Sequence, residues 1–196
     1  MTAMVRSLTG VLGKPEMLTA ITSMLGETES TDGSAPILPK LIARYLGTSD
    51  RTARSAVRLS LVALVGGLAD RAHRPIWASA LYTLLDRHDP ALLDNPSHLV
   101  PTSDDPEASE TVDMILGHRR LLVEIEIADE TGLSETTVSR LLELLVPISL
   151  SFLARKKRGE GMDRNAMVTY LTAQESAQQA GQPAVARTWV AGRDPN

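Results

Sequence analysis

The chain has 196 residues, enough for one domain, or two small ones, with a hydrophobic core. Apolar residues make up 43% but aromatics only 3%, so the core must be packed mainly from Leu, Val, Ile and Ala, which favours helices over sheet. The lack of cysteine excludes disulfides and thiolate metal sites, and a net charge of −4 indicates no strong preference for a class of partner.

The predicted helices fall into four segments. Two short helices are expected in residues 1–25, a first helical copy in 37–94, a second helical copy in 107–173 and a largely disordered tail in 174–196. Polar stretches at 26–36 and 101–109 act as linkers. The tail is expected to be disordered because it consists mostly of Gln, Ala, Ser, Gly and Pro. The two copies together are expected to form one domain.

Turn residues divide the first copy into three helices. Gly47 ends a short helix, because glycine adopts the left-handed conformation at little cost. Ser49 is placed to cap the long helix that follows. Gly66 and Gly67 are expected to interrupt this helix where another backbone comes close. Pro75 then opens a further amphipathic helix.

The second copy is organised around residues 121–157, which predict a helix, a tight turn and a second helix capped by Ser134. A small residue, a turn glycine and two apolar residues have the spacing of a helix-turn-helix motif: Ala128, Gly132, Val138 and Leu141. DNA-binding proteins use this spacing, but any close corner between two helices needs it too. The pattern alone therefore does not establish DNA binding.

The second helix of this corner is apolar nearly all round, which is typical of a buried helix. We expect Leu141, Leu145 and Phe152 to lie in the core. The corner is also acidic, with one positive charge at Arg140 against six carboxylates: Glu124, Glu126, Asp129, Glu130, Glu135 and Glu143. Because a duplex is bound mainly through its phosphates, this charge argues against a recognition helix here.

The two copies are related in sequence. Residues 42–69 align with 127–154 at a constant offset of 85, without a gap, and eight of the 28 positions are identical. The identities include the turn glycines Gly47 and Gly132 and the capping serines Ser49 and Ser134. A shared amphipathic composition would not by itself preserve the turn residues and the register. We therefore expect a duplication: a compact all-α array built from two tandem related helix-turn-helix-like halves.

Three stretches of the second copy resemble a bacterial family of unknown function, the YidB-like family. They are ILGH (115–118), ADETGLSETTVSRLLELLVPISLSFLARK (128–156) and GMDRNAMVTYL (161–171). In the first copy, ILPKLIARYLG and LVALVGGLADRAH are similar to the same family, so the resemblance covers most of 37–171. It implies a compact all-α fold and a bacterial source, and it implies no activity. The chain departs from the family pattern at 119–126, where Gly- and Gln-rich sequence is common.

No pattern in the chain predicts catalysis, and we expect neither an enzyme nor a bound cofactor. The four histidines are scattered without the spacing of metal ligands, so no metal site is expected. Neither a nucleophile elbow, a phosphate loop nor a dinucleotide fingerprint is present. The longest apolar runs, 59–68 and 144–154, are shorter than the ~20 residues that span a bilayer, and residues 1–13 lack the apolar core of a signal peptide. A cytoplasmic protein without membrane association is expected.

The first copy carries the charges that a nucleic-acid-binding protein would use. Arg51, Arg54 and Arg58 lie three and four residues apart on one helical face, and Arg44 lies on the preceding helix. These four arginines form the candidate site of an alternative function, a helix-turn-helix protein that binds nucleic acid. We favour a solvated or partner-facing surface, because the stretch lacks interleaved Asn or Gln that read base edges.

The favoured interpretation is a non-catalytic structural or protein-interaction module that self-associates as a homo-oligomer or a head-to-tail assembly. The two copies carry opposite charges at matched positions, where Arg44 corresponds to Asp129 and Arg58 to Glu143. In a pseudo-two-fold arrangement such positions meet near the axis. An inter-copy contact through these four residues is therefore expected, either within one chain or between chains.

Overall fold

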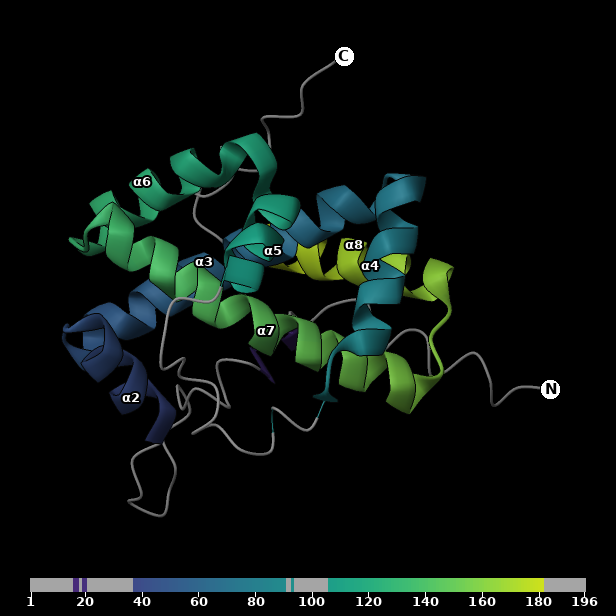
Figure 1. Cartoon of the computed structure of the whole chain (residues 1–196), viewed down its shortest axis with the longest axis horizontal. Coiled ribbons are helices and arrows are strands. Elements are labelled where there is room, and N and C mark those ends of the chain that lie inside the picture. Colours follow the sequence, from purple (N-terminus) through teal and green to yellow (C-terminus); the bar gives the residue numbers. More distant parts are fainter. Residues whose placement is uncertain (1–15, 18, 21–36, 91–92, 94–105, 182–196) are drawn as a thin grey trace.

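The computed structural model describes residues 16–17, 19–20, 37–90, 93 and 106–181, and this part of the chain is helical without a strand (Figure 1). Its α-helices are α2 (Ile37–Leu46), α3 (Asp50–Ala72), α4 (Pro75–Arg87), α5 (Pro106–Leu116), α6 (Arg120–Thr131), α7 (Glu135–Glu160) and α8 (Arg164–Gly181). A 3-10 turn, Gly117–Arg119, joins α5 to α6. The predicted all-α class is confirmed. α5 begins at Pro106, inside the stretch expected to be a linker.

The two longest helices, α3 and α7, form the centre of the fold. They pack against each other; α2 and α8 pack on α3, and α4, α5 and α6 pack on both α3 and α7. In Figure 1 both begin at the left-hand side of the molecule, where the α2–α3 and α6–α7 corners lie. This arrangement lets short outer helices cover both long apolar helices.

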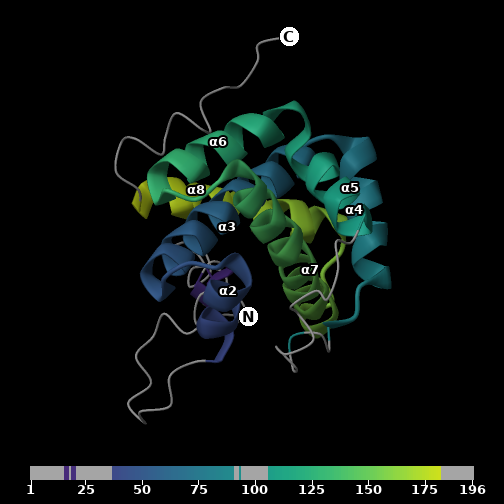
Figure 2. The same cartoon turned by 60° about the vertical axis from the view of Figure 1, so that its left-hand side comes forward.

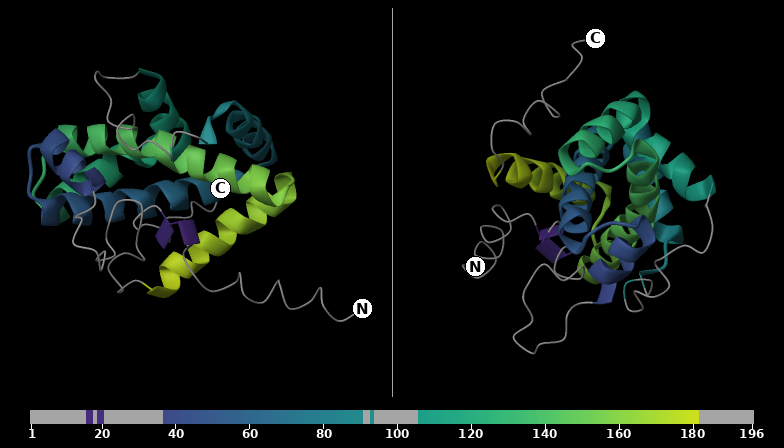
Figure 3. Two further views of the ribbon diagram at one scale, coloured as in Figure 1. Left: turned by 90° about the horizontal axis from the view of Figure 1, so that it is seen from below. Right: turned by 90° about the vertical axis from the view of Figure 1, so that its left-hand side faces the viewer.

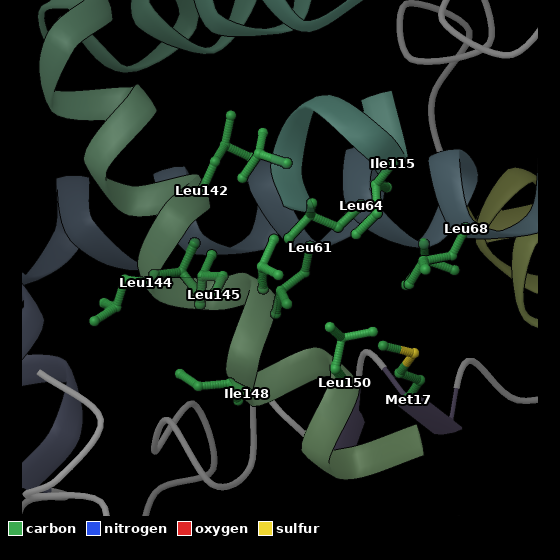
Figure 4. Packing of buried hydrophobic residues seen from close by; sticks show 14 of the residues in the cluster. Met17, Leu61, Leu64, Leu68, Ile115, Leu142, Leu144, Leu145, Ile148 and Leu150 are labelled. Carbon is green, nitrogen blue, oxygen red and sulfur yellow. The ribbon is translucent and has the colours of Figure 1, made fainter. Parts of the chain in front are cut away.

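The core is aliphatic, as the composition requires. Figure 4 shows Leu61, Leu64 and Leu68 of α3 in the same cluster as the leucines of α7. Leu141 and Leu145 have no exposed surface, and Phe152 is partly buried against the cluster. These three residues are core residues, as predicted. Burying apolar surface contributes about 25 cal/mol per Å², so α3 and α7 dominate the stability of the fold.

The two helix corners have the same geometry. Gly47 and Gly132 both have a left-handed backbone, with φ of 64° and 71°. Ser49 caps α3 by accepting a hydrogen bond from the backbone N of Thr52 at 3.2 Å. Ser134 caps α7 in the same way, from Thr137 at 3.2 Å. Both predicted turns and both predicted caps are confirmed, because the local chemistry of Gly and Ser decides them.

The adjacent glycines Gly66 and Gly67 do not interrupt α3, contrary to the sequence prediction. The helix runs through them without a break. A methyl group built on Gly67 would come within 2.8 Å of the side chain of Ile115 and 3.1 Å of its carbonyl oxygen, whereas one built on Gly66 meets nothing within 4 Å. The expected close approach of another backbone therefore exists at Gly67, where α3 passes beneath α5. It does not require a break in α3.

The predicted tail begins too early in the chain. α8 continues to Gly181, and the side chains of Gln174 and Gln178 are buried. The Gln174 amide oxygen accepts a hydrogen bond at 2.9 Å from the backbone N of Met17, a fully buried residue. Figure 3 shows this N-terminal segment, in purple, beside α8, in yellow. Residues 182–196, and most of the region 1–25 predicted to hold two short helices, lie outside the described residues.

Candidate functional site

The first turns of helix α6 bury a carboxylate and expose two leucines. Glu124 is only 9% exposed, whereas Leu121 and Leu122 are 58% and 60% exposed. Figure 2 shows α6 on the outside of the fold, over α3 and α7. We call the solvent-facing residues of this helix the outer face of α6: Leu121, Leu122, Glu126, Asp129 and Glu130. This face combines exposed leucines with exposed carboxylates.

A hydrogen-bond cluster around Arg120 holds α6 in this orientation. The guanidinium binds Glu124 of the same helix at 2.8 Å, Glu143 of α7 at 3.0 Å and Asp113 of α5 at 3.0 Å. It also donates to the Ser139 hydroxyl at 2.8 Å. Charge-assisted bonds of this kind are about twice as strong as neutral ones. With Arg120 and Glu124 directed inward, Leu121 and Leu122 are left in solvent.

The charge on Arg120 persists in spite of burial. Burial opposes the charged form, but hydrogen bonds and attraction from Glu124 and Asp113 exceed that effect and raise the pKa of the guanidinium above its ordinary value. Partial burial raises the pKa of the Glu126 carboxyl on the outer face. The cluster is therefore an ion network that joins three helices.

A basic stripe runs along the first turns of α3. Arg51, Arg54 and Arg58 are exposed, and so is Arg44 on α2. No side chain within the described residues forms an ion pair with any of these four. The structure thus places the predicted nucleic-acid site on an open surface, with three of its members on one face of one helix.

The structure does not bring together the residues of the predicted inter-copy contact. Asp129 is exposed on α6, and no ion pair joins it to Arg44 in the described part of the chain. Glu143 is half-buried and bound by Arg120 instead of Arg58. A contact within one chain through Arg58 and Glu143 is therefore wrong, while a contact between chains stays a prediction.

Other polar groups of the described region are occupied in joining helices. Lys157 of α7 is buried, donates to Asp86 at 2.6 Å and to the Tyr82 carbonyl at 3.0 Å, and lies over the Tyr82 ring. An open depression of about 420 Å³ lies between α4 and the start of α8. There Arg164 donates to Ser79 at 2.8 Å, and Asp163 accepts from the Ala166 backbone N. Among the described residues, no three acidic or histidine side chains gather as metal ligands.

Two helices are long and apolar enough to cross a membrane by length and hydropathy. They are α3 and α7, and 61% and 67% of their most apolar windows are buried inside the fold. The core helices of a soluble protein have the same properties, so this is weak evidence for a membrane location.

Residues 31–156 match the model of a family described as a bacterial protein of unknown function, DUF937. The chain belongs to this family. The match runs from before α2 to near the end of α7, so it includes both helix corners. The predicted resemblance to the YidB-like family is confirmed. No curated protein and no solved structure matches the chain.

Sequence reasoning missed the Arg120 cluster and the outer face of α6, even though both lie inside the DUF937 match. The available signal was Arg120 and Glu124 at a spacing of four, the arrangement of an ion pair within one helix. Leu121 and Leu122, which lie between these two residues, do not by themselves show which side of the helix is exposed. The partners that draw Arg120 inward come from α5 and α7, and local sequence does not show them.

Proposed function

We propose that the chain is a non-catalytic structural or protein-interaction module that associates with copies of itself. The outer face of α6 is the observation that carries this proposal. Single exposed apolar residues are normal on a protein surface, but two adjacent exposed leucines on a helix that buries Glu124 need a reason to be there. A partner that covers them would supply it.

The opposite charges of two exposed surfaces support self-association. The outer face of α6 carries Glu126, Asp129 and Glu130, and the basic stripe of α3 carries three arginines without an ion-pair partner among the described residues. Complementary charge steers protein association and selects the partner. A chain that presents both surfaces has the complement that another copy needs.

We also propose that the fold arose by duplication of a three-helix unit, α2–α3–α4 and α6–α7–α8. The matched corner glycines and capping serines support this. The alternation of buried and exposed positions along α3 and α7 also agrees closely at the offset of 85. In addition, α8 packs on α3, and α4 packs on α7 as well as on α3. The contacts of α8 with α3 and of α4 with α7 are the pair that a pseudo-two-fold relation between the halves would match.

The polar clusters favour a structural role over catalysis. The Arg120 cluster joins α5, α6 and α7, and Lys157 with Asp86 joins α7 to α4. Both clusters use their charges in contacts between helices. A cytoplasmic location without membrane association fits the same interpretation, because the two most apolar helices are mostly buried in the fold.

Binding of nucleic acid through Arg44, Arg51, Arg54 and Arg58 is the second candidate, because these side chains are exposed and have no ion-pair partner among the described residues. Two observations weigh against it. The helix in the recognition position of the second corner, α7, is buried in the core. The exposed surface of α6 beside that corner is acidic, which repels phosphates.

The test is light scattering over a wide range of protein concentration, combined with titration of duplex DNA at several salt concentrations. We expect the average mass to rise with concentration and DNA to bind weakly or not at all. A constant monomeric mass would overturn the proposal. Tight DNA binding that weakens steeply with salt would favour the alternative function.

A further inference from the structure

We propose that the outer face of α6 docks antiparallel on the basic stripe of α3 in a second copy of the chain. This inference rests on the proposed self-association and names the surfaces that carry it. In this contact, the exposed leucines and carboxylates of α6 in one copy are covered by the exposed arginine side of α3 in the other copy.

The order of side chains along the two helices supports an antiparallel contact. The outer face of α6 is apolar at its first turn, with Leu122, and acidic further on, with Glu126 and Glu130. The exposed side of α3 is basic at its start and becomes apolar at Val62, which is half-buried. Apolar therefore meets apolar, and acid meets base, only when the helices run in opposite directions.

The spacing fits one register. Residues 122, 126 and 130 of α6 are four apart, as are residues 62, 58 and 54 of α3. In the antiparallel register, Leu122 faces Val62, Glu126 faces Arg58 and Glu130 faces Arg54. At 1.5 Å per residue, each row is about 12 Å long. A parallel contact would instead set Leu122 against Arg54 and leave Glu130 on an apolar patch, which would desolvate unpaired charges.

Docking within a single chain is not what the structure shows. α3 and α6 of one chain pack against each other, yet both charged surfaces stay exposed and no ion pair joins them in the described residues. The internal contact uses the opposite side of α6, which carries the buried Ile127 and Ala128. A second copy can therefore reach both surfaces.

The contact is small, and this sets its strength. It covers little more than two helical turns, whereas stable interfaces bury roughly 1,200–2,000 Å² in total. One such contact gives weak association that needs high concentration. Because every chain offers both surfaces, the contacts either close into a symmetric dimer, each chain using both faces, or repeat head-to-tail into a longer assembly.

The lack of cysteine makes a direct crosslinking test possible. Leu122→Cys and Val62→Cys are made in separate chains, mixed and oxidised. The control mixture replaces Leu122→Cys with Ile76→Cys, a residue of α4 that is 84% exposed and lies outside the proposed contact. We expect the 122–62 mixture to form the mixed disulfide much faster than the control. Equal rates in the two mixtures would overturn the inference.

A charge exchange gives a second readout at exposed positions. Glu126→Arg should weaken self-association by up to about tenfold at low salt, because attraction to Arg58 becomes repulsion. Adding Arg58→Glu to the same chain should restore it. Circular dichroism melts verify that each variant folds.

The outcomes separate this inference from the proposed function. Suppose that the wild-type chain self-associates, that the charge exchange does not change this association, and that the 122–62 disulfide forms no faster than the control. This result would refute the α6–α3 contact but not self-association itself. A wild-type chain that stays monomeric at all concentrations would refute both. Loss of DNA binding with Arg58→Glu, together with a monomeric wild type, would assign the basic stripe to nucleic acid.

Discussion

At the scale of single residues, two residues of the same type have different roles when only one of them is in contact with other helices. Gly67 lies under α5 and Gly66 does not, although both are in the middle of α3. Arg120 is enclosed by acids from three helices, whereas Arg54 is exposed. Residue type alone does not distinguish the members of either pair.

Replacement of Gly67 by alanine should destabilise the fold by about 1–3 kcal/mol, because the new methyl group would force α5 away from α3. Gly66→Ala is the matched control. It should stabilise by about 0.5–1 kcal/mol, since alanine favours a helix interior and space is open there. Urea unfolding of both variants provides the measurement. Equal effects would show that the close approach at Gly67 is not present.

Replacement of Arg120 by methionine should cost about 3–5 kcal/mol, because the buried Glu124 and the half-buried Glu143 would lose their partner. Arg54→Met, on the exposed side of α3, should change stability by less than about 0.5 kcal/mol. Adding Glu124→Met to Arg120→Met should recover part of the loss. A loss below about 1 kcal/mol for Arg120→Met would mean that the cluster does not orient α6.

At the scale of helices, the sequence predicts what is decided locally. The corner turns at Gly47 and Gly132 and the caps at Ser49 and Ser134 follow from backbone and side-chain chemistry within four residues. The burial of α7 follows from an apolar surface nearly all round. The orientation of α6 could not be predicted in this way, because it depends on Asp113 and Glu143, which come from other helices.

The end of α8 failed as a prediction for a related reason. Gln174 and Gln178 count as polar in any composition argument, yet both are buried. The partner of Gln174 is the backbone of Met17, which is 157 residues away in the chain. Composition alone cannot reveal such a long-range contact, so it wrongly predicts disorder at these residues.

Truncation of the chain should therefore show a sharp boundary within α8. Ending the chain after Ala173 removes Gln174 and Gln178 and should lower the melting temperature, by about 2–4 °C for each kcal/mol lost. Ending it after Gly181 keeps both residues and should retain the melting temperature. If the two truncated chains have the same melting temperature, the last two turns of α8 contribute nothing to the stability of the fold.

The leucines of α6 and α7 should respond in opposite ways to substitution. Leu141→Ala should cost about 2–5 kcal/mol, because Leu141 has no exposed surface and its removal leaves a cavity. Leu122→Ala should change stability by less than about 0.5 kcal/mol, because the side chain is mostly in solvent. Denaturant titration at low protein concentration compares them. A large loss of stability for Leu122→Ala would show that Leu122 faces the core and that α6 has the opposite orientation.

At the scale of the whole molecule, helices of the two predicted copies pack against each other. α4 of the first half packs on α7 of the second, α8 of the second packs on α3 of the first, and residues of all the long helices share one core. Residues of both predicted copies thus contribute to one hydrophobic core, and the expectation that they form a single domain stays a prediction. The register of the sequence predicts a relation between the two copies, but it does not show how their helices pack together.

Self-association through the outer face of α6 can be tested by sedimentation velocity over a concentration series. The measurement compares the wild-type chain with the Leu121→Ser/Leu122→Ser variant. We expect the wild-type mass to rise above the 21.1 kDa of one chain as concentration increases, while the equally stable variant remains a monomer. A wild-type chain that stays at 21.1 kDa throughout, or a variant that associates as strongly as the wild type, would contradict it.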